Sequence, residues 1–137
     1  MNVPMPAGMG DAEYLRVFRE VIVPVGLEYR PELVLVSAGF DAHRDDPLGG
    51  MKLSSAGYAA ITREILRLAR DACQGRAVFA LEGGYNLQAL EESIASVLGV
   101  MSGGVMELPP DPGPAADDLI RELREVHGEY WSSLRRS

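Results

Sequence analysis

The sequence predicts an α/β fold in which parallel strands alternate with helices. Two short apolar runs, residues 33–36 (LVLV) and 77–81 (AVFAL), have the length and the β-branched or aromatic content of strands. Each is flanked by segments whose apolar residues recur at helical spacing. Strands that alternate with helices pair in parallel through right-handed crossovers. Because the first run is continuously apolar, we expect that strand to be buried on both faces.

The composition is that of one globular domain without a membrane span or a nucleic-acid partner. The chain has 137 residues, 47% apolar and 24% charged, which suffices for a single core. Its net charge of −7 argues against a protein that follows nucleic-acid phosphates, and no apolar run is long enough to cross a bilayer. Cys73 is the only cysteine and no secretory signal is visible. We therefore expect a cytoplasmic protein with Cys73 as a small buried side chain.

The N-terminal part predicts a loop followed by one helix. Residues 1–10 contain two prolines and two glycines and show no periodicity. Asp11 is the expected N-cap, and helical spacing of apolar residues continues to about Tyr29. Pro24 should kink this helix because proline has no N–H and its ring meets the preceding turn.

The same spacing predicts the remaining helices. Ser54 should cap a helix that ends at Gly75, and Asn86 should cap the next one. The apolar faces of these two helices are expected to consist of Tyr58, Ile61, Ile65, Leu68 and Ala72, and of Leu87, Leu90, Ile94, Val97 and Met101. The last helix should bury Leu119, Leu123, Val126, Tyr130 and Leu134.

The chain thus divides into an N-terminal loop (1–10), an alternating core (11–101), a linker rich in glycine and proline (102–114) and a C-terminal helix (115–135). Two strands make a very small parallel sheet, and a lone sheet of this kind would leave an apolar edge open. We expect either that another chain covers this edge or that the sequence is a piece of a larger domain.

The first candidate functional residue is Asp41, directly after the first strand, where ligands bind in open α/β sheets. A carboxylate there can bind a cation or can simply cap loop amides. Asp41 and His43 also form an Asp-x-His pair, but two ligands are too few for a catalytic zinc. His127, the only other histidine, is expected on the exposed side of the last helix.

The second candidate is Tyr85, which follows Gly83 and Gly84 just past the second strand. The glycines permit a tight turn that brings the phenol to the same edge as Asp41, and a phenol can stabilise an oxyanion. Taken alone, a tyrosine packed on a neighbouring helix is the favoured interpretation, and Glu82 is more typical of a solvated carboxylate than of a general acid. The chain has no phosphate-binding glycine loop, which disfavours a small nucleotide-binding domain.

Taken together, three runs resemble a known family: SAGFDAH (37–43), DPLGG (46–50) and LEGGYN (81–86). They are similar to the C-terminal part of the zinc-dependent deacetylases, which include histone deacetylases, acetylpolyamine amidohydrolases and acetoin-utilisation proteins. Glu82 before the glycine pair is more like the class II and bacterial members. The resemblance covers residues 2–131 and implies part of an arginase-like three-layer α/β domain with a parallel sheet.

The resemblance also implies roles for individual residues. Asp41 matches an aspartate that binds the zinc cofactor, and Tyr85 matches the tyrosine that hydrogen-bonds the scissile carbonyl oxygen. Leu48 matches a residue that lines the substrate tunnel, and Gly83 and Gly84 match glycines of its wall. The implied substrates are acetylated lysine or acetylated amines.

The family's other zinc ligands and its water-activating histidine pair have no counterpart in these residues, and His43 matches no ligand. The expected function is therefore that of one part of a zinc deacetylase, joined by a complementing N-terminal part. The alternative is a non-catalytic module that self-associates or docks on a partner. We expect the chain alone to bind no stoichiometric zinc.

Overall fold

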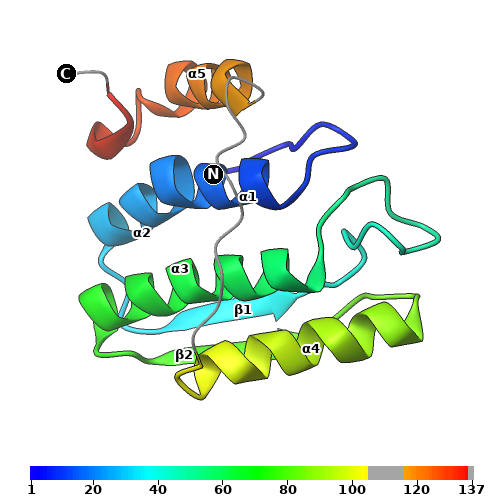
Figure 1. The fold of residues 1–137 in the computed structure, drawn as a ribbon. Helices are drawn as coiled ribbons and strands as arrows, with labels where there is room; N and C mark the ends of the chain where they lie inside the picture. Colours follow the sequence, from blue (N-terminus) through cyan, green and yellow to red (C-terminus); the bar gives the residue numbers. More distant parts are fainter. Residues whose placement is uncertain (105–115, 136–137) are drawn as a thin grey trace.

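A computed structural model describes residues 1–104 and 116–135, and Figure 1 shows its fold. Most of the predicted 102–114 linker lies outside the described residues. The elements, in chain order, are α1 (Asp11–Val17), the π-helical turn η1 (Phe18–Ile22), α2 (Val23–Tyr29), β1 (Val34–Ala38), α3 (Ser55–Cys73), β2 (Ala77–Leu81), α4 (Leu87–Met101), α5 (Asp117–His127) and the short 3₁₀ helix η3 (Ser132–Leu134). In this part of the chain no helix is both long and apolar enough to cross a membrane.

The two strands pair in parallel, as predicted, from Val34 opposite Ala77 to Ala38 opposite Leu81. The prediction that the first strand is buried on both faces is wrong. Leu35 is 72% exposed and its partner Val78 is 52% exposed, while the alternate side chains point toward the helices and are partly covered. Side chains of a strand alternate between the two faces of its sheet. These exposures therefore mean that, in the described residues, only one face of the sheet is covered.

The central element is α3, which lies between the strands and the α1–α2 pair and also packs on α4 (Figure 1). Its predicted N-cap is confirmed, since the Ser54 hydroxyl accepts the Gly57 N–H at 3.1 Å. The next cap is confirmed as well, with Asn86 Oδ1 accepting the Ala89 N–H at 3.1 Å. Cys73 is buried, as expected. The predicted face of α4 is wrong at its two ends, where Leu87 and Met101 are exposed.

Pro24 produces a π-helical turn before α2. The N–H of Val23 reaches back five residues to the carbonyl of Phe18, which gives the wider turn that a proline ring and its missing donor require. At the other end the predicted N-cap is wrong by one residue, because Gly10 precedes the first helical residue. The carboxylate of Asp11 instead accepts the N–H and the hydroxyl of Ser54, at 2.7 and 2.5 Å. It therefore ties the start of α1 to the start of α3.

The C-terminal residues pack on the opposite side of α1–α2 from α3 (Figure 1). The predicted helix 115–135 is shorter in the structure, since α5 ends at His127. The predicted burial of Val126, in the last turn of α5, and of Tyr130, beyond the helix end, is wrong, since both are exposed. The hydrophobic core between these residues and the first helices consists of Val17, Val21, Val25, Ala116, Leu119, Ile120, Leu123 and Leu134.

His127 is partly buried rather than solvated, which corrects the prediction of an exposed side chain. Its Nε2 donates to the carbonyl of Asn2 at 2.8 Å. The carboxylate of Glu28 in α2 similarly accepts the backbone N–H groups of Ser132 and Ser133, at 3.0 and 2.8 Å. The first and last segments of the described chain are thus both fastened by side-chain hydrogen bonds.

Candidate active-site edge

The loops that follow the two strands lie against each other at the carboxyl edge of the sheet. Phe40 donates its N–H to the carbonyl of Gly83 at 2.8 Å, and Glu82 donates to the carbonyl of Ala38 at 3.0 Å. These bonds extend the parallel pairing past the strand ends. The sequence prediction that the residues after both strands meet at one edge is therefore confirmed.

Asp46 joins the two loops, a role that the sequence analysis did not assign to it. Its Oδ1 accepts the N–H groups of Leu48 and Gly49, at 2.9 and 3.0 Å, and its Oδ2 accepts the N–H of Tyr85 at 2.8 Å. The Asn86 amide adds a bond to the carbonyl of Asp45 at 2.9 Å. The backbone of Tyr85 is thus anchored to the loop that carries Leu48. Aspartate followed by proline in a turn is the sequence signal for such a carboxylate.

The hydrogen bonds shift the pKa of Asp46. Desolvation of the carboxyl raises its pKa, but the bonds from Tyr85, Leu48 and Gly49 together outweigh desolvation and hold the pKa below the ordinary value of 3.8. A lowered pKa means that the ionised form is favoured in the folded chain. Asp46 therefore stabilises the folded state above the unfolded pKa, and this contribution is lost as the pH falls through the folded pKa.

We expect Asp46→Asn to lower the free energy of unfolding at pH 7 and to lose this effect in acid. The amide cannot supply two acceptor oxygens for three N–H groups, so the loop junction weakens. Urea denaturation of the wild type and the variant at a series of pH values measures the difference. This difference should shrink as the pH falls below 3.8, the ordinary value for the group. Asp45→Asn, on the exposed neighbour, is the matched control, and a difference that does not vary with pH would contradict the assigned role.

The carboxylate of Asp41 lies at the exposed rim of this edge, directly against the second loop. A Cβ atom on Gly83 would lie 2.9 Å from Asp41 Oδ2, and one on Gly49 would lie 1.8 Å from the Asp41 carbonyl oxygen. Only glycine fits at position 49, because the obstacle there is backbone, whereas a side chain at position 83 would require the Asp41 carboxylate to move. The two glycines therefore leave room for Asp41 at the rim.

Tyr85 and Leu48 are also at this edge and are open to solvent. Tyr85 is 58% exposed and Leu48 is 72% exposed. Between Gly83 and Tyr85 the chain turns at Gly84, whose φ of +139° is a conformation that side chains rarely adopt. The structure thus brings all five predicted site residues, Asp41, Leu48, Gly83, Gly84 and Tyr85, to two adjoining loops.

His43 does not belong to this set of exposed groups. Its side chain is buried, its Nδ1 accepts the N–H of Asp45 at 3.1 Å, and its Nε2 lies 3.5 Å from the Ser55 hydroxyl. The Ser55 hydroxyl in turn lies 3.1 Å from that of Ser93 in α4. His43 is therefore a structural residue that links the loop to α3 and, through Ser55 and Ser93, to α4.

The donor set at this edge is insufficient for a zinc site of its own. A catalytic zinc takes three protein ligands, and among residues 1–104 and 116–135 no group of three histidine, cysteine, aspartate or glutamate residues could hold a metal ion. Asp41 offers one carboxylate, and His43 is engaged elsewhere. The described residues can contribute a ligand to a zinc site but cannot complete one.

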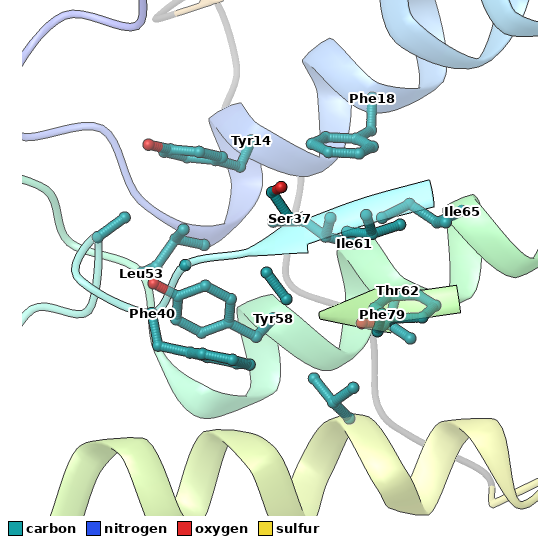
Figure 2. A pocket seen from close by; sticks show the side chains of 15 residues that line it. Tyr14, Phe18, Ser37, Phe40, Leu53, Tyr58, Ile61, Thr62, Ile65 and Phe79 are labelled. Atoms are coloured by element: carbon teal, nitrogen blue, oxygen red, sulfur yellow. The ribbon is translucent and has the colours of Figure 1, made fainter. Parts of the chain in front are cut away.

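Behind this edge is an apolar cavity of about 190 Å³, shown in Figure 2, between α1, α3 and the covered face of the strands. Tyr58 lies in its wall and packs against Phe40, with ring centroids 4.9 Å apart and ring planes tilted by 49°. Burial raises the pKa of Tyr58, and its hydroxyl has no hydrogen-bond partner in the described chain. Most of the other lining residues are apolar, such as Phe18, Ile61 and Phe79, and Tyr14, Ser37 and Thr62 add hydroxyl groups.

Comparison with known proteins shows the family to which the chain belongs. The family described as "Histone deacetylase domain" matches residues 1–101. The chain is 39% identical to "Histone deacetylase 14, chloroplastic" of Arabidopsis thaliana, over 92% of this chain and 30% of that protein. It is 38% identical to "Histone deacetylase HDA1" of Saccharomyces cerevisiae, over 98% of this chain and 19% of that protein. A "Probable deacetylase" of Archaeoglobus fulgidus is 31% identical, over 98% of this chain and 42% of that protein.

Two solved structures have the same fold. The histone deacetylase Clr3 matches with a TM-score of 0.88 at 34% identity, over 98% of this chain and 23% of that chain. The HDA15 HD domain matches with a TM-score of 0.82 at 34% identity, over 98% of this chain and 36% of that chain. The predicted fold, a portion of a deacetylase-like α/β domain, is confirmed. The chain spans less than half the length of the relatives that it matches, and it belongs to the histone deacetylase family.

Proposed function

We propose that this chain supplies one part of a zinc-dependent deacetylase site that acts on acetylated lysine or acetylated amines. Asp41 provides one carboxylate ligand, Tyr85 donates a hydrogen bond to the substrate carbonyl, and Leu48, Gly83 and Gly84 line the approach to the site. The observation that carries the proposal is that the Asp41 carboxylate lies against Gly83 at the rim. Gly83 in turn stands two residues before the exposed Tyr85, and the chain belongs to the deacetylase family.

The chemistry assigned to the chain itself is the stabilisation of charge on the substrate oxygen. When an amide is hydrolysed, negative charge develops on its carbonyl oxygen, and a fixed phenol O–H stabilises it. Asp46 supports this role, because it holds the backbone N–H of Tyr85 and so fixes the base of the side chain. Bound zinc supplies Lewis-acid polarisation of the carbonyl and an activated water. The remaining ligands come from residues outside the described set.

The uncovered face of the sheet supports the proposal that a further part of the domain completes the site. Leu35 and Val78 form an apolar pair on the open face, and within residues 1–104 and 116–135 each strand has one unpaired edge. Exposed apolar surface and unpaired strand edges favour association. A complementing part that covers this face would also bring the missing ligands to the Asp41 edge.

The test is a deacetylation assay on the isolated chain and on a completed domain. The completed domain is this chain joined to the part of the Arabidopsis Histone deacetylase 14 domain that it does not match. We expect zinc-dependent release of acetate from acetyl-lysine peptide or acetylpolyamine by the completed domain, and none above background by the isolated chain. Robust zinc-dependent turnover by the 137-residue chain alone would contradict the proposed division of the site.

The second candidate function is a non-catalytic module that self-associates through the same open face. The exposure of Leu35 and Val78 supports this function as much as it supports a part of a deacetylase domain. Light scattering over a range of concentrations distinguishes the cases: self-association that persists after the completing part is added favours the module. A compact, stable monomer at high concentration would contradict the expectation that this face needs a cover.

A further inference from the structure

A second polar site lies on the C-terminal half of α3, away from the Asp41 edge. A groove of about 700 Å³ runs between α3, the π-helical turn and the end of α4, and four arginines line it: Arg19, Arg63, Arg67 and Arg70. Its volume is within the range of small-molecule sites. Because an α-helix rises 1.5 Å per residue, Arg67 lies roughly 18 Å along α3 from Ser55, which borders the Asp41 loop. We call this site the arginine groove.

The charge in the arginine groove is strongly positive. Its lining residues carry four guanidinium groups and one carboxylate, that of Glu64, on a chain whose net charge is −7. Arg63, Arg67 and Arg70 are four and three residues apart on one helix, where like charges face each other and repel. Outside the lining, Asp71 adds only a 3.7 Å contact to Arg70. The groove therefore concentrates cations that are not balanced by its own residues.

Glu64 organises these cations rather than neutralising them. Its side chain is 6% exposed. Its Oε1 accepts from Arg19 Nε at 2.9 Å and its Oε2 accepts from Arg67 Nε at 3.0 Å, while Arg63 Nη2 lies 3.6 Å from Oε1. Since Arg19 and Arg67 use Nε for these bonds, the outer nitrogen atoms of their guanidinium groups can donate to a ligand. The buried carboxylate thus sets the orientation of a group of donors.

Three carbonyls at the neighbouring end of α4 are occupied by hydrogen bonds. Helix C-termini carry unpaired carbonyls and partial negative charge. Here the carbonyls of Leu98, Gly99 and Val100 accept the N–H groups of Ser102, Gly104 and Gly103. The groove is therefore lined by four guanidinium groups, the Glu64 carboxylate, a few apolar atoms and a helix end with three hydrogen-bonded carbonyls.

We propose that the arginine groove binds a compact polyphosphate anion, such as the di- or triphosphate group of a small molecule. Guanidinium groups form paired, charge-assisted hydrogen bonds with phosphate oxygens. Four of them within two turns of one helix and the adjoining π-helical turn match a small, highly charged group better than an extended acidic peptide. The site is separate from the deacetylase edge and does not depend on the proposed deacetylase function.

Isothermal titration of the 137-residue chain with tripolyphosphate at low salt tests the proposal. We expect saturable binding of one anion per chain, weakened by added salt, and weaker binding of sulfate. Arg70→Gln should weaken binding about tenfold, and the Arg67→Gln/Arg70→Gln pair about a hundredfold. The Arg67→Lys/Arg70→Lys pair should be intermediate, because lysine keeps the charge but loses the fork.

Arg121→Gln is the matched control, because Arg121 is exposed and pairs with Asp118 in α5. It removes the same charge elsewhere on the chain and should leave the affinity unchanged. Arg70→Gln touches none of the hydrogen bonds to Glu64, so it remains decisive if the double variant does not fold. The proposal is overturned if tripolyphosphate does not saturate, if sulfate binds as tightly, if Arg121→Gln weakens binding equally, or if a glutamate-rich peptide binds the groove more tightly.

Discussion

Replacing Asp41 by alanine in the completed domain is expected to abolish both zinc retention and deacetylation. A catalytic zinc has three protein ligands, and the loss of one leaves too few to retain the ion. The carboxylate lies at the exposed rim, and packing of the core does not depend on it. The variant should therefore remain folded. Elemental analysis and an acetate-release assay measure the two effects on the same preparation.

Asp45→Ala is the matched control for this substitution. It removes the same charge from the same loop, where the side chain is 64% exposed and lies 3.7 Å from His43 Nδ1. Zinc content and turnover should stay near those of the unmodified domain. If Asp41→Ala retained a full complement of zinc, the assignment of Asp41 as a ligand would be wrong.

Replacing Tyr85 by phenylalanine in the completed domain is expected to lower kcat by about 10²–10³, the usual cost of one oxyanion donor. The zinc content should not change, because the phenol is not a ligand in this assignment. The backbone bond from Tyr85 to Asp46 at 2.8 Å does not involve the hydroxyl and should persist. The comparison is therefore between two domains with the same loop and the same metal.

Tyr130→Phe removes an exposed hydroxyl far along the sequence and serves as the control for Tyr85→Phe. It should leave kcat and KM unchanged. If Tyr85→Phe raised KM and left kcat unaltered, Tyr85 would bind the substrate rather than stabilise the developing charge.

Local signals predicted most of the architecture. Ser54 and Asn86 each stand before an amphipathic run and cap it as expected. The strands end where small residues and glycines begin, so the functional edge could be placed from the sequence alone. These features depend on residues only a few positions apart.

Features that depend on distant partners could not be predicted in this way. Asp11 bonds Ser54, 43 residues on, and Asp46 bonds Tyr85, 39 residues on. Glu64 is buried, because it meets Arg19 from the π-helical turn, 45 residues away. The local pattern does not identify these distant partners, although the Asp-Pro turn at Asp46 does indicate a carboxylate bonded to nearby loop amides.

The exposure of one face of the sheet also could not be predicted from the local sequence. Leu35 lies in a continuous apolar run that is typical of a strand covered on both sides, yet it is 72% exposed. The pattern matches a strand within a larger sheet domain, and the solved deacetylase chains are several times the length matched here. The sequence pattern therefore describes the environment of the strand in such a domain better than its environment in this chain.

The most direct test is the zinc stoichiometry of the purified chain compared with that of the completed domain. The division of ligands proposed here predicts one zinc per completed domain and far less than one per isolated chain, with Asp41→Ala removing the metal only from the completed domain. One zinc per isolated chain, lost when Asp41 and His43 are replaced, would contradict it and would establish a local site made by these two residues.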